Sequence, residues 1–169
     1  DLPLKNNFED LYKGLPLATG RINDDLMYRH WDHWVDTYSH VFYADYDGAK
    51  LTNDKDIMEG EPYSSPLAPF GGIEQIDWSR DGKFIVYTSK KLLGKAASLS
   101  TNSDLYLYSL ETKETKNITD GMMGFDLAPL YSPDGNYIAW ESMERDGFES
   151  DKNRLFIIDT KTWEKTYAI

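Results

Sequence analysis

The chain has 169 residues, no cysteine and a net charge of −11, and 40% of its residues are hydrophobic. Its length suits one domain with a packed core, whereas its negative charge would repel a nucleic acid and argues against such a partner. The lack of cysteine excludes disulfides, thiolate nucleophiles and cysteine-ligated zinc, and no apolar stretch approaches the roughly 20 residues that a membrane-spanning helix needs.

Residues 1–38 are expected to form an N-terminal extension and a first strand region. Apolar residues follow Asn7 at helical spacing, which predicts a short helix that ends near Gly14. The segment DDLMYRHWDHWVDTYSH comes next and gathers all three histidines of the chain. A helix capped by Asn23 and a strand leading into Ser39 both fit this segment, and its periodicity does not decide between them.

The same segment contains a candidate metal site. His30 and His33, with Asp32 or Asp36, are ligand types that bind zinc. However, His-x-x-His alone is a weak pattern, and a single strand would point the two histidines to opposite faces. The alternative is an aromatic-rich segment that packs against the first sheet, and we therefore expect neither a metal nor a cofactor.

Residues 39–53 predict a β-hairpin. Their sequence, SHVFYADYDGAKLTN, contains a strand, a turn at Asp47-Gly48 and a second strand. The segment KLTN at the end of this hairpin aligns with NITD at residues 117–120. The hairpin therefore matches the last two strands of a longer unit that recurs downstream.

Residues 54–72 are expected to form an irregular connecting loop, because they contain three prolines and three glycines. Such loops often carry function. Glu59 and Glu61 are candidates for contact with a cationic group, although a solvated linker is the alternative interpretation. The remaining candidate contacts with a substrate or a channel come from the histidine-rich segment: Arg29, His30, Trp31 and Trp34.

The C-terminal part of the chain carries a repeat. WSRDGKFIVYTS begins at Trp78, and YSPDGNYIAWES begins 53 residues later at Tyr131. DLYLYSLETKET begins at Asp104, and RLFIIDTKTWEK begins 50 residues later at Arg154. Two matches in the same order at nearly constant spacing indicate two copies of one unit.

Each copy is consistent with four short antiparallel strands. Ser-x-Asp-Gly predicts a tight turn, because the Asp side chain bonds the backbone ahead of it and Gly accepts a positive φ. An apolar and aromatic run follows, then a polar loop, a second run, another turn and a last strand, expected at residues 117–119 and 166–169. Four strands in about 50 residues are typical of a β-propeller blade.

The predicted fold is therefore all-β: a partial β-propeller of about two and a half four-stranded antiparallel blades. A half blade (39–53), a connecting loop (54–72) and two blades (73–121 and 122–169) make up one incomplete propeller domain.

The sequence contains no catalytic constellation. Gly-x-Ser-x-Gly, a P-loop and a supported Ser-His-Asp order are all missing, so we expect no catalytic residue in this chain. A propeller closes with about four to eight blades. We therefore expect the chain to be a piece of a longer protein, or copies of it to complete one another and self-associate through unpaired blade edges.

These motifs resemble those of a known family. YSPDGNYIAWESMERDG followed by RLFIIDTKT, with the sister copy, resembles the propeller repeat of TolB-like proteins and of the prolyl oligopeptidase family of serine peptidases. DDLMYRHWDHWVDTYSHVFYADYDGAKLTN with the later PFGG resembles the bacterial dipeptidyl-peptidase and acylaminoacyl-peptidase types of that family. The likeness covers roughly residues 20–169.

The resemblance implies a non-catalytic, N-terminal propeller that gates peptide access to a C-terminal α/β-hydrolase domain with a Ser-Asp-His triad. No triad position exists in this chain. The implied partners are the rest of the propeller, the hydrolase domain and peptide substrates, with no nucleic acid and no membrane, in the periplasm or outside the cell. The alternatives are a TolB-like protein-binding propeller and a carbohydrate-active propeller with a histidine-held metal.

Overall fold

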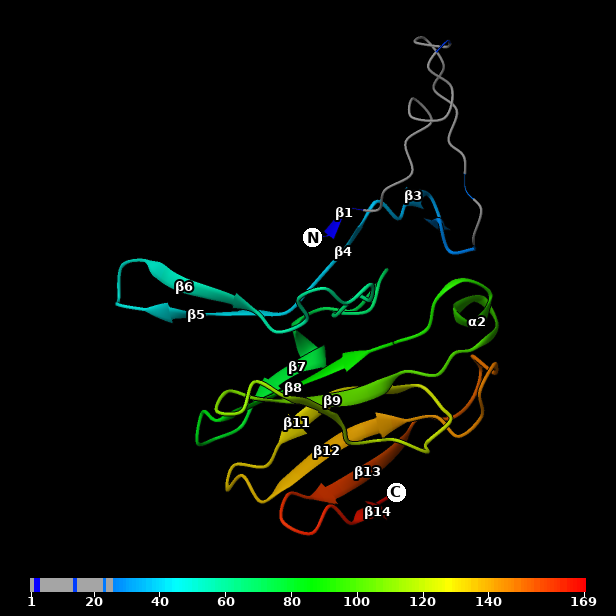
Figure 1. Cartoon of the computed structure of the whole chain (residues 1–169). Coiled ribbons are helices and arrows are strands. Elements are labelled where there is room, and N and C mark those ends of the chain that lie inside the picture. Colours follow the sequence, from blue (N-terminus) through cyan, green and yellow to red (C-terminus); the bar gives the residue numbers. More distant parts are fainter. Residues whose placement is uncertain (1, 4–13, 15–22, 24–25) are drawn as a thin grey trace.

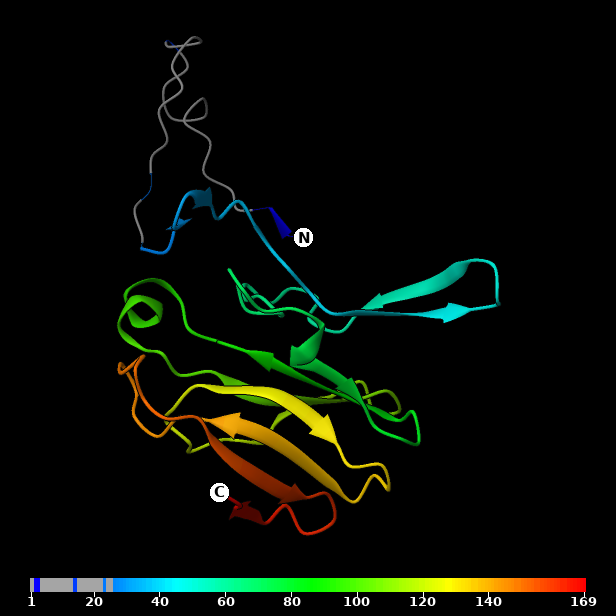
Figure 2. The ribbon, with the colours of Figure 1, turned by 180° about the vertical axis from the view of Figure 1, so that it is seen from behind.

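The computed structural model describes residues 2–3, 14, 23 and 26–169. Two four-stranded antiparallel sheets stack face to face, and a two-stranded hairpin lies beyond the first of them (Figure 1). The view from behind shows the same stacking (Figure 2). The predicted fold class is confirmed: the chain is an all-β partial propeller with two complete blades and half of another. The helix expected after Asn7 lies outside the described residues.

The first sheet has the strand order β10-β9-β8-β7, and every neighbouring pair is antiparallel. The connection from β8 to β9 contains α2 (Gly94–Leu99), where the sequence predicted only a polar loop. No helix in the described ranges is both long and apolar enough to cross a membrane. The bounds of the other elements are η1 (Ile73–Gln75), β7 (Ile76–Trp78), β8 (Phe84–Ser89), β9 (Asp104–Ser109) and β10 (Thr115–Asn117).

The second sheet has the order β11-β12-β13-β14, also antiparallel throughout. β10 lies earlier than the predicted 117–119. β14 begins one residue before the predicted 166, and main-chain hydrogen bonds between Leu155 and residues Ala168 and Ile169 continue its pairing. After Asn117 the hydroxyl of Thr119, rather than a main-chain carbonyl, accepts a hydrogen bond from Leu105 N at 3.0 Å, so the regular ladder stops. The strands are β11 (Asp126–Tyr131), β12 (Tyr137–Ser142), β13 (Arg154–Asp159) and β14 (Lys165–Tyr167).

Short hairpins precede the two sheets. The β5–β6 hairpin turns at Asp47-Gly48, where the Asp47 carboxylate accepts hydrogen bonds from Ala49 N and Lys50 N, and Gly48 has a φ of 94°. In Figure 1 this hairpin projects away from the sheets. The remaining strands are β1 (Leu2–Pro3), β2 (Arg29–His30), β3 (His33–Trp34), β4 (Thr37–Tyr38), β5 (Phe42–Tyr46) and β6 (Leu51–Asp56).

The core consists of two apolar layers, one on each face of the first sheet. Because strand side chains alternate between faces, Val86 faces the second sheet, while Ile85 and Tyr87 face the loop after β6. The layer between the sheets contains Val86, Leu105, Leu107, Ile118, Tyr131, Ile138, Trp140 and Ile158. The other layer contains Val41, Ile57, Met58, Ile85, Tyr87, Tyr106 and Tyr108.

Candidate functional site

The repeated Ser-x-Asp-Gly turns resemble a catalytic pair in sequence but serve the backbone in the structure. Ser79 Oγ donates to Asp81 Oδ1 at 2.7 Å and accepts from Phe84 N at 2.9 Å. Asp81 also accepts from Lys83 N at 3.1 Å. Every polar atom of the serine is therefore used to close the β7–β8 turn.

The second copy repeats this network. Ser132 Oγ donates to Asp134 Oδ1 at 2.6 Å and accepts from Tyr137 N at 3.0 Å. Gly135 has the same φ of 72° as Gly82 in the first copy. The hydrogen bond from Ser132, with those from Asn136, lowers the pKa of Asp134 to about 2. These turns are structural, and neither serine lies beside a histidine.

The histidine-rich segment forms a tight hairpin. β2 pairs with β3 so that His30 lies directly opposite His33, and Trp31 makes the turn with a φ of 52°. The expectation that one strand would separate the two histidines onto opposite faces is wrong, because the chain reverses between them. Residues 29–36 therefore form neither of the two predicted elements, a single helix or a single strand leading into Ser39.

The candidate contacts Arg29, Trp31 and Trp34 lie together on this hairpin. The Arg29 guanidinium lies 5.3 Å from the Trp34 ring centroid, and the Trp31 ring meets the Phe70 ring edge-on at 5.1 Å. Trp31 and Phe70 are 71% and 76% exposed. We call Trp31, Trp34 and Phe70 with Arg29 the aromatic hairpin surface. It joins the histidine-rich segment to the connecting loop.

The two glutamates of the connecting loop have different surroundings. Glu59 is exposed, whereas the carboxylate of Glu61 contacts Lys91 Nζ at 2.7 and 2.5 Å. The Lys91 ammonium also lies 4.2 Å from the Tyr106 ring centroid. Glu61 thus has a cationic partner within the chain, 30 residues away in sequence.

His40 occupies a buried structural position. Its side chain is 1% exposed, with Nδ1 2.7 Å from Asp56 Oδ2 and Nε2 3.0 Å from the carbonyl oxygen of Glu61. His33 contacts the exposed carboxylate of Asp32 at 3.2 Å. In the part of the chain that the structure describes, no group of three or more His, Cys, Asp or Glu side chains is arranged to hold a metal ion.

A buried polar cluster lies where the two sheets meet, and the sequence reasoning did not find it. Asp126 opens β11 with none of its surface exposed and accepts from Trp140 Nε1 at 3.1 Å. Thr119 Oγ1 donates to Asp104 Oδ1 at 3.1 Å nearby. Burial raises the pKa of Asp126 to about 6 and also raises the pKa of Asp104. The only sequence signal was an aspartate just before an apolar strand.

Elsewhere on the boundary between the two sheets, the strands β7 and β11 exchange polar contacts. Tyr131 N donates to Asp77 Oδ2 at 2.8 Å, and Arg80 Nη2 donates to the carbonyl oxygen of Tyr131 at 3.0 Å. Arg80 also lies 3.5 Å from the Asp77 carboxylate. β7 and β11 are therefore joined by side chains of the first blade that hold the backbone of the second.

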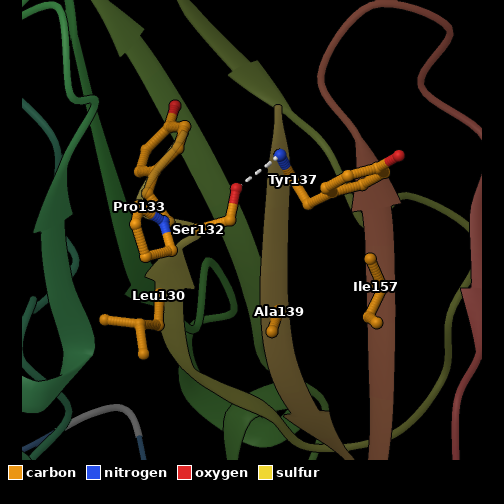
Figure 3. A pocket seen from close by; sticks show the side chains of 7 residues that line it. Leu130, Ser132, Pro133, Tyr137, Ala139 and Ile157 are labelled. Atoms are coloured by element: carbon orange, nitrogen blue, oxygen red, sulfur yellow. Dashed lines mark hydrogen bonds between the residues drawn. The ribbon is translucent and has the colours of Figure 1, made fainter. Parts of the chain in front are cut away.

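An apolar hollow lies on the far face of the second sheet, which is the face turned away from the first sheet. Its volume is about 320 Å³, and no charged side chain lines it. Figure 3 shows its lining, with Ser132 bonded to the backbone of Tyr137 at the rim. The labelled lining residues are Leu130, Ser132, Pro133, Tyr137, Ala139 and Ile157.

Comparison with known proteins found several relatives. The chain is 53% identical over 168 residues to the protein named dipeptidyl-peptidase 5 of Porphyromonas gingivalis, covering 99% of this chain and 25% of that protein. It is 48% identical over 158 residues to the protein of the same name of Porphyromonas endodontalis, covering 94% and 23%. The protein of that name of Aspergillus fumigatus is 31% identical over 163 residues, covering 84% and 22%.

No family model matches the chain. The crystal structure of TolB from Acinetobacter baumannii aligns with a TM-score of 0.44 at 17% identity, covering 76% of this chain and 29% of that chain. The chain spans about a quarter of the length of the curated relatives it matches. It is therefore a peptidase-related β-propeller segment, similar over nearly all of its length to part of the proteins named dipeptidyl-peptidase 5.

Proposed function

We propose that the chain is the non-catalytic propeller segment of a serine exopeptidase of the prolyl oligopeptidase family, of the dipeptidyl-peptidase or acylaminoacyl-peptidase type. The segment gates and scaffolds the access of peptides to an α/β-hydrolase domain elsewhere in the same polypeptide, in the periplasm or outside the cell. The observation that carries the proposal is the 53% identity to a protein named dipeptidyl-peptidase 5 over 168 residues.

The chemistry of the described residues supports a non-catalytic role. A serine nucleophile needs a histidine within hydrogen-bond reach of its hydroxyl. Both ring nitrogens of His40 are engaged by Asp56 and by the carbonyl of Glu61, and His30 and His33 lie in a surface hairpin. The two serines of the repeated turns bond to their own loops.

The aromatic hairpin surface is the part of this segment that we assign to peptide contact. Exposed aromatic rings bind apolar side chains and cations, and they are enriched at the centres of binding surfaces. Trp31 and Phe70 already touch each other edge-on, so the two rings present one preformed apolar surface. Glu59, Glu61 and His30 are further candidate contacts, and the Glu61 carboxylate pairs with Lys91.

The proposal is tested on the longer polypeptide and on the chain alone. We expect the reading frame to continue into further blades and then a Gly-x-Ser-x-Gly segment, and the longer protein to release dipeptides or acylated amino acids from peptide amides. The 169-residue chain alone should show no turnover. A reading frame that ends as a propeller without a hydrolase domain would instead support a TolB-like binding protein.

A variant of the longer enzyme tests the assigned surface. Trp31→Ala with Phe70→Ala should raise KM for apolar dipeptidyl substrates by about threefold to tenfold, with kcat unchanged, because ground-state contacts are lost. Tyr46→Ala removes an equally exposed ring at the tip of the β5–β6 hairpin and serves as the control. An unchanged KM in the double variant would contradict the assignment.

A further inference from the structure

Two aspartates from different sheets lie together inside the boundary between the blades. Asp126 opens β11 of the second sheet, and Asp104 opens β9 of the first. The backbone brings them together: Asp126 N donates to the carbonyl oxygen of Ser103 at 3.2 Å, and Ser103 Oγ donates to the carbonyl oxygen of Asp126 at 2.8 Å. Asp126 is therefore tied to the residue directly before Asp104. We call these two aspartates the carboxylate pair.

The side chain of Asp126 is buried with one of its oxygens unsatisfied. Oδ1 accepts from Trp140 Nε1 at 3.1 Å, whereas no described residue donates to Oδ2. Two neighbouring hydroxyls donate elsewhere: that of Ser142 to the carbonyl oxygen of the next residue at 3.1 Å, and that of Thr119 to Asp104 Oδ1 at 3.1 Å. A buried carboxylate oxygen without a donor is costly while the group is charged, and a proton removes that cost.

No cation compensates the charges of the carboxylate pair. The charge of Asp104 acts on Asp126, and the charge of Asp120 acts on Asp104. Among the described residues, no lysine, arginine or histidine forms an ion pair with any of these three aspartates. Burial, followed by the charge of Asp104, raises the pKa of Asp126. The other side chains that face the pair are Thr119, Trp140 and Ser142 at Asp126, and Asn102, Tyr106, Asn117 and Thr119 at Asp104.

We propose that Asp104 and Asp126 form a proton-dependent switch at the boundary between the two blades. While the carboxylate pair holds one proton, Asp126 is neutral, only Asp104 is charged, and the boundary stays closed. When the proton leaves, two like charges face each other in a buried site. The boundary then opens locally more often, because opening brings water to both carboxylates. The ligand of this site is a proton, and the switch does not depend on the proposed peptidase role.

Hydrogen exchange in the longer natural protein tests the switch. The amide of Asp126 donates to Ser103, and the amide of Leu105 donates to Thr119, so peptides that contain these amides report opening of the boundary. Their protection, corrected for the intrinsic effect of pH on exchange, should fall about tenfold from pH 5 to pH 8. This is the fall for a carboxyl with a pKa of about 6 when closed and 3.8 when open. Protection of residues 155–158, inside the second sheet, should change less than about twofold.

Two variants of that protein separate the switch from other titrations. Asp126→Asn keeps an acceptor for Trp140 but cannot ionise, so protection at the boundary should be equal at both pH values. Asp134→Asn is the matched control, because it changes an exposed carboxylate of the β11–β12 turn and should leave the fall in place. If Asp126→Asn fails to fold, Asp104→Asn removes the neighbouring like charge and should reduce the fall to about fivefold.

Three outcomes would overturn the proposal. The first is equal protection of the boundary at pH 5 and pH 8 in the wild type. The second is a fall that persists in Asp126→Asn, or one that is unchanged in Asp104→Asn. The third is a recovery of protection at pH 8 on addition of calcium chloride or potassium chloride but not of choline chloride at equal ionic strength, which would assign the carboxylate pair to a metal cation. No readout uses peptidase activity, so failure of the proposed function would be seen separately.

Discussion

The backbone nitrogen of Tyr131 donates to the carboxylate of Asp77 at 2.8 Å, across the boundary between two sheets. Asp77 lies on β7, the first strand of the first blade, and Tyr131 on β11, the first strand of the second. Arg80 completes the contact by donating to the carbonyl oxygen of Tyr131 and pairing with Asp77. The backbone N–H and C=O of one residue of the second blade are thus both held by side chains of the first.

Asp77→Ala should lower the free energy of unfolding by about 1–3 kcal/mol, because the amide of Tyr131 loses its acceptor and Arg80 loses its partner. Urea unfolding measures the loss. Glu111→Ala, in the exposed β9–β10 turn, is the matched control and should change stability by less than about 0.5 kcal/mol. Equal stability of the two variants would show that the seam does not depend on this contact.

Replacing the serines of the two repeated turns should lower the free energy of unfolding without changing catalytic activity. Ser79→Ala removes the acceptor for two backbone amides, and Ser132→Ala removes the acceptor for one. Each variant also removes one donor to an aspartate. We expect losses of about 1 kcal/mol, larger for Ser79 because it is 8% exposed. Peptidase activity of the longer protein should survive both changes at temperatures below unfolding.

The Ser132→Ala variant has a second readout. The hydrogen bond from Ser132 is the largest cause of the lowered pKa of Asp134, about 2, so this pKa should rise toward 3.8 in the variant. A lowered pKa stabilises the fold above pH 3.8, and that stabilisation is lost as the pH falls through 2. The stability difference between wild type and variant should therefore shrink as the pH falls from 3.8 toward 2, because a carboxyl with the same pKa in both states adds no pH dependence. Carbon-detected NMR titration of Asp134 measures the shift directly.

Asp126→Asn should remove a pH dependence of stability. Burial raises the pKa of Asp126 from 3.8 to about 6, so its contribution favours the fold most below pH 3.8 and is lost as the pH rises through 6. The shift corresponds to roughly 3 kcal/mol, and an amide still accepts from Trp140. The variant should gain stability over the wild type at pH 8 but not at pH 4. Chemical denaturation at both values measures the difference, and a parallel pH profile would contradict it.

Lys91→Met should destabilise the chain by about 1–2 kcal/mol, because it leaves the partly buried Glu61 carboxylate without its ion-pair partner. Glu61→Gln in the same chain should recover part of that loss, since the unpaired charge is then gone. Lys83→Met is the control: its pair with Asp81 is 3.6 Å long, with side chains 65% and 54% exposed, and should contribute little. A double variant as unstable as Lys91→Met would contradict the coupling.

The isolated 169-residue chain should self-associate. β5 and β6 pair only with each other among the described strands. Unpaired strand edges promote association. Sedimentation velocity should show species larger than a monomer as the concentration rises, whereas the longer protein should not show the same trend. A monomer across the range would contradict this expectation.

The turns and strands could be predicted because their chemistry is local. Asp47-Gly48 and the two Ser-x-Asp-Gly segments each place a carboxylate two or three residues before the amides it bonds. The repeat then gave the strand number without any long-range information. The fold class follows from these short-range contacts alone.

The contacts that join elements could not be predicted in the same way. Lys91 reaches Glu61 across 30 residues, and Tyr131 reaches Asp77 across 54. No periodicity connects such positions, because the partner depends on how sheets stack. The histidine hairpin was missed for a different reason: it turns at Trp31, a bulky residue that rarely takes a positive φ. The roles of Glu59, His30 and the aromatic hairpin surface remain predictions.

At the repeat spacing of 53 residues, Asp77 and Arg80 correspond to Leu130 and Pro133. This difference between the two blades affects how a chain of similar repeats folds into one arrangement. If blades exchanged places during folding, Asp77 would be buried against an apolar counterpart without its acceptor role, at a cost comparable to a lost buried hydrogen bond. Equivalent positions at the boundaries of the two blades thus differ in charge and polarity. Repeats with similar strands can therefore still pack in one spatial order, because residues at the blade boundary, such as Asp77 on β7, differ between them.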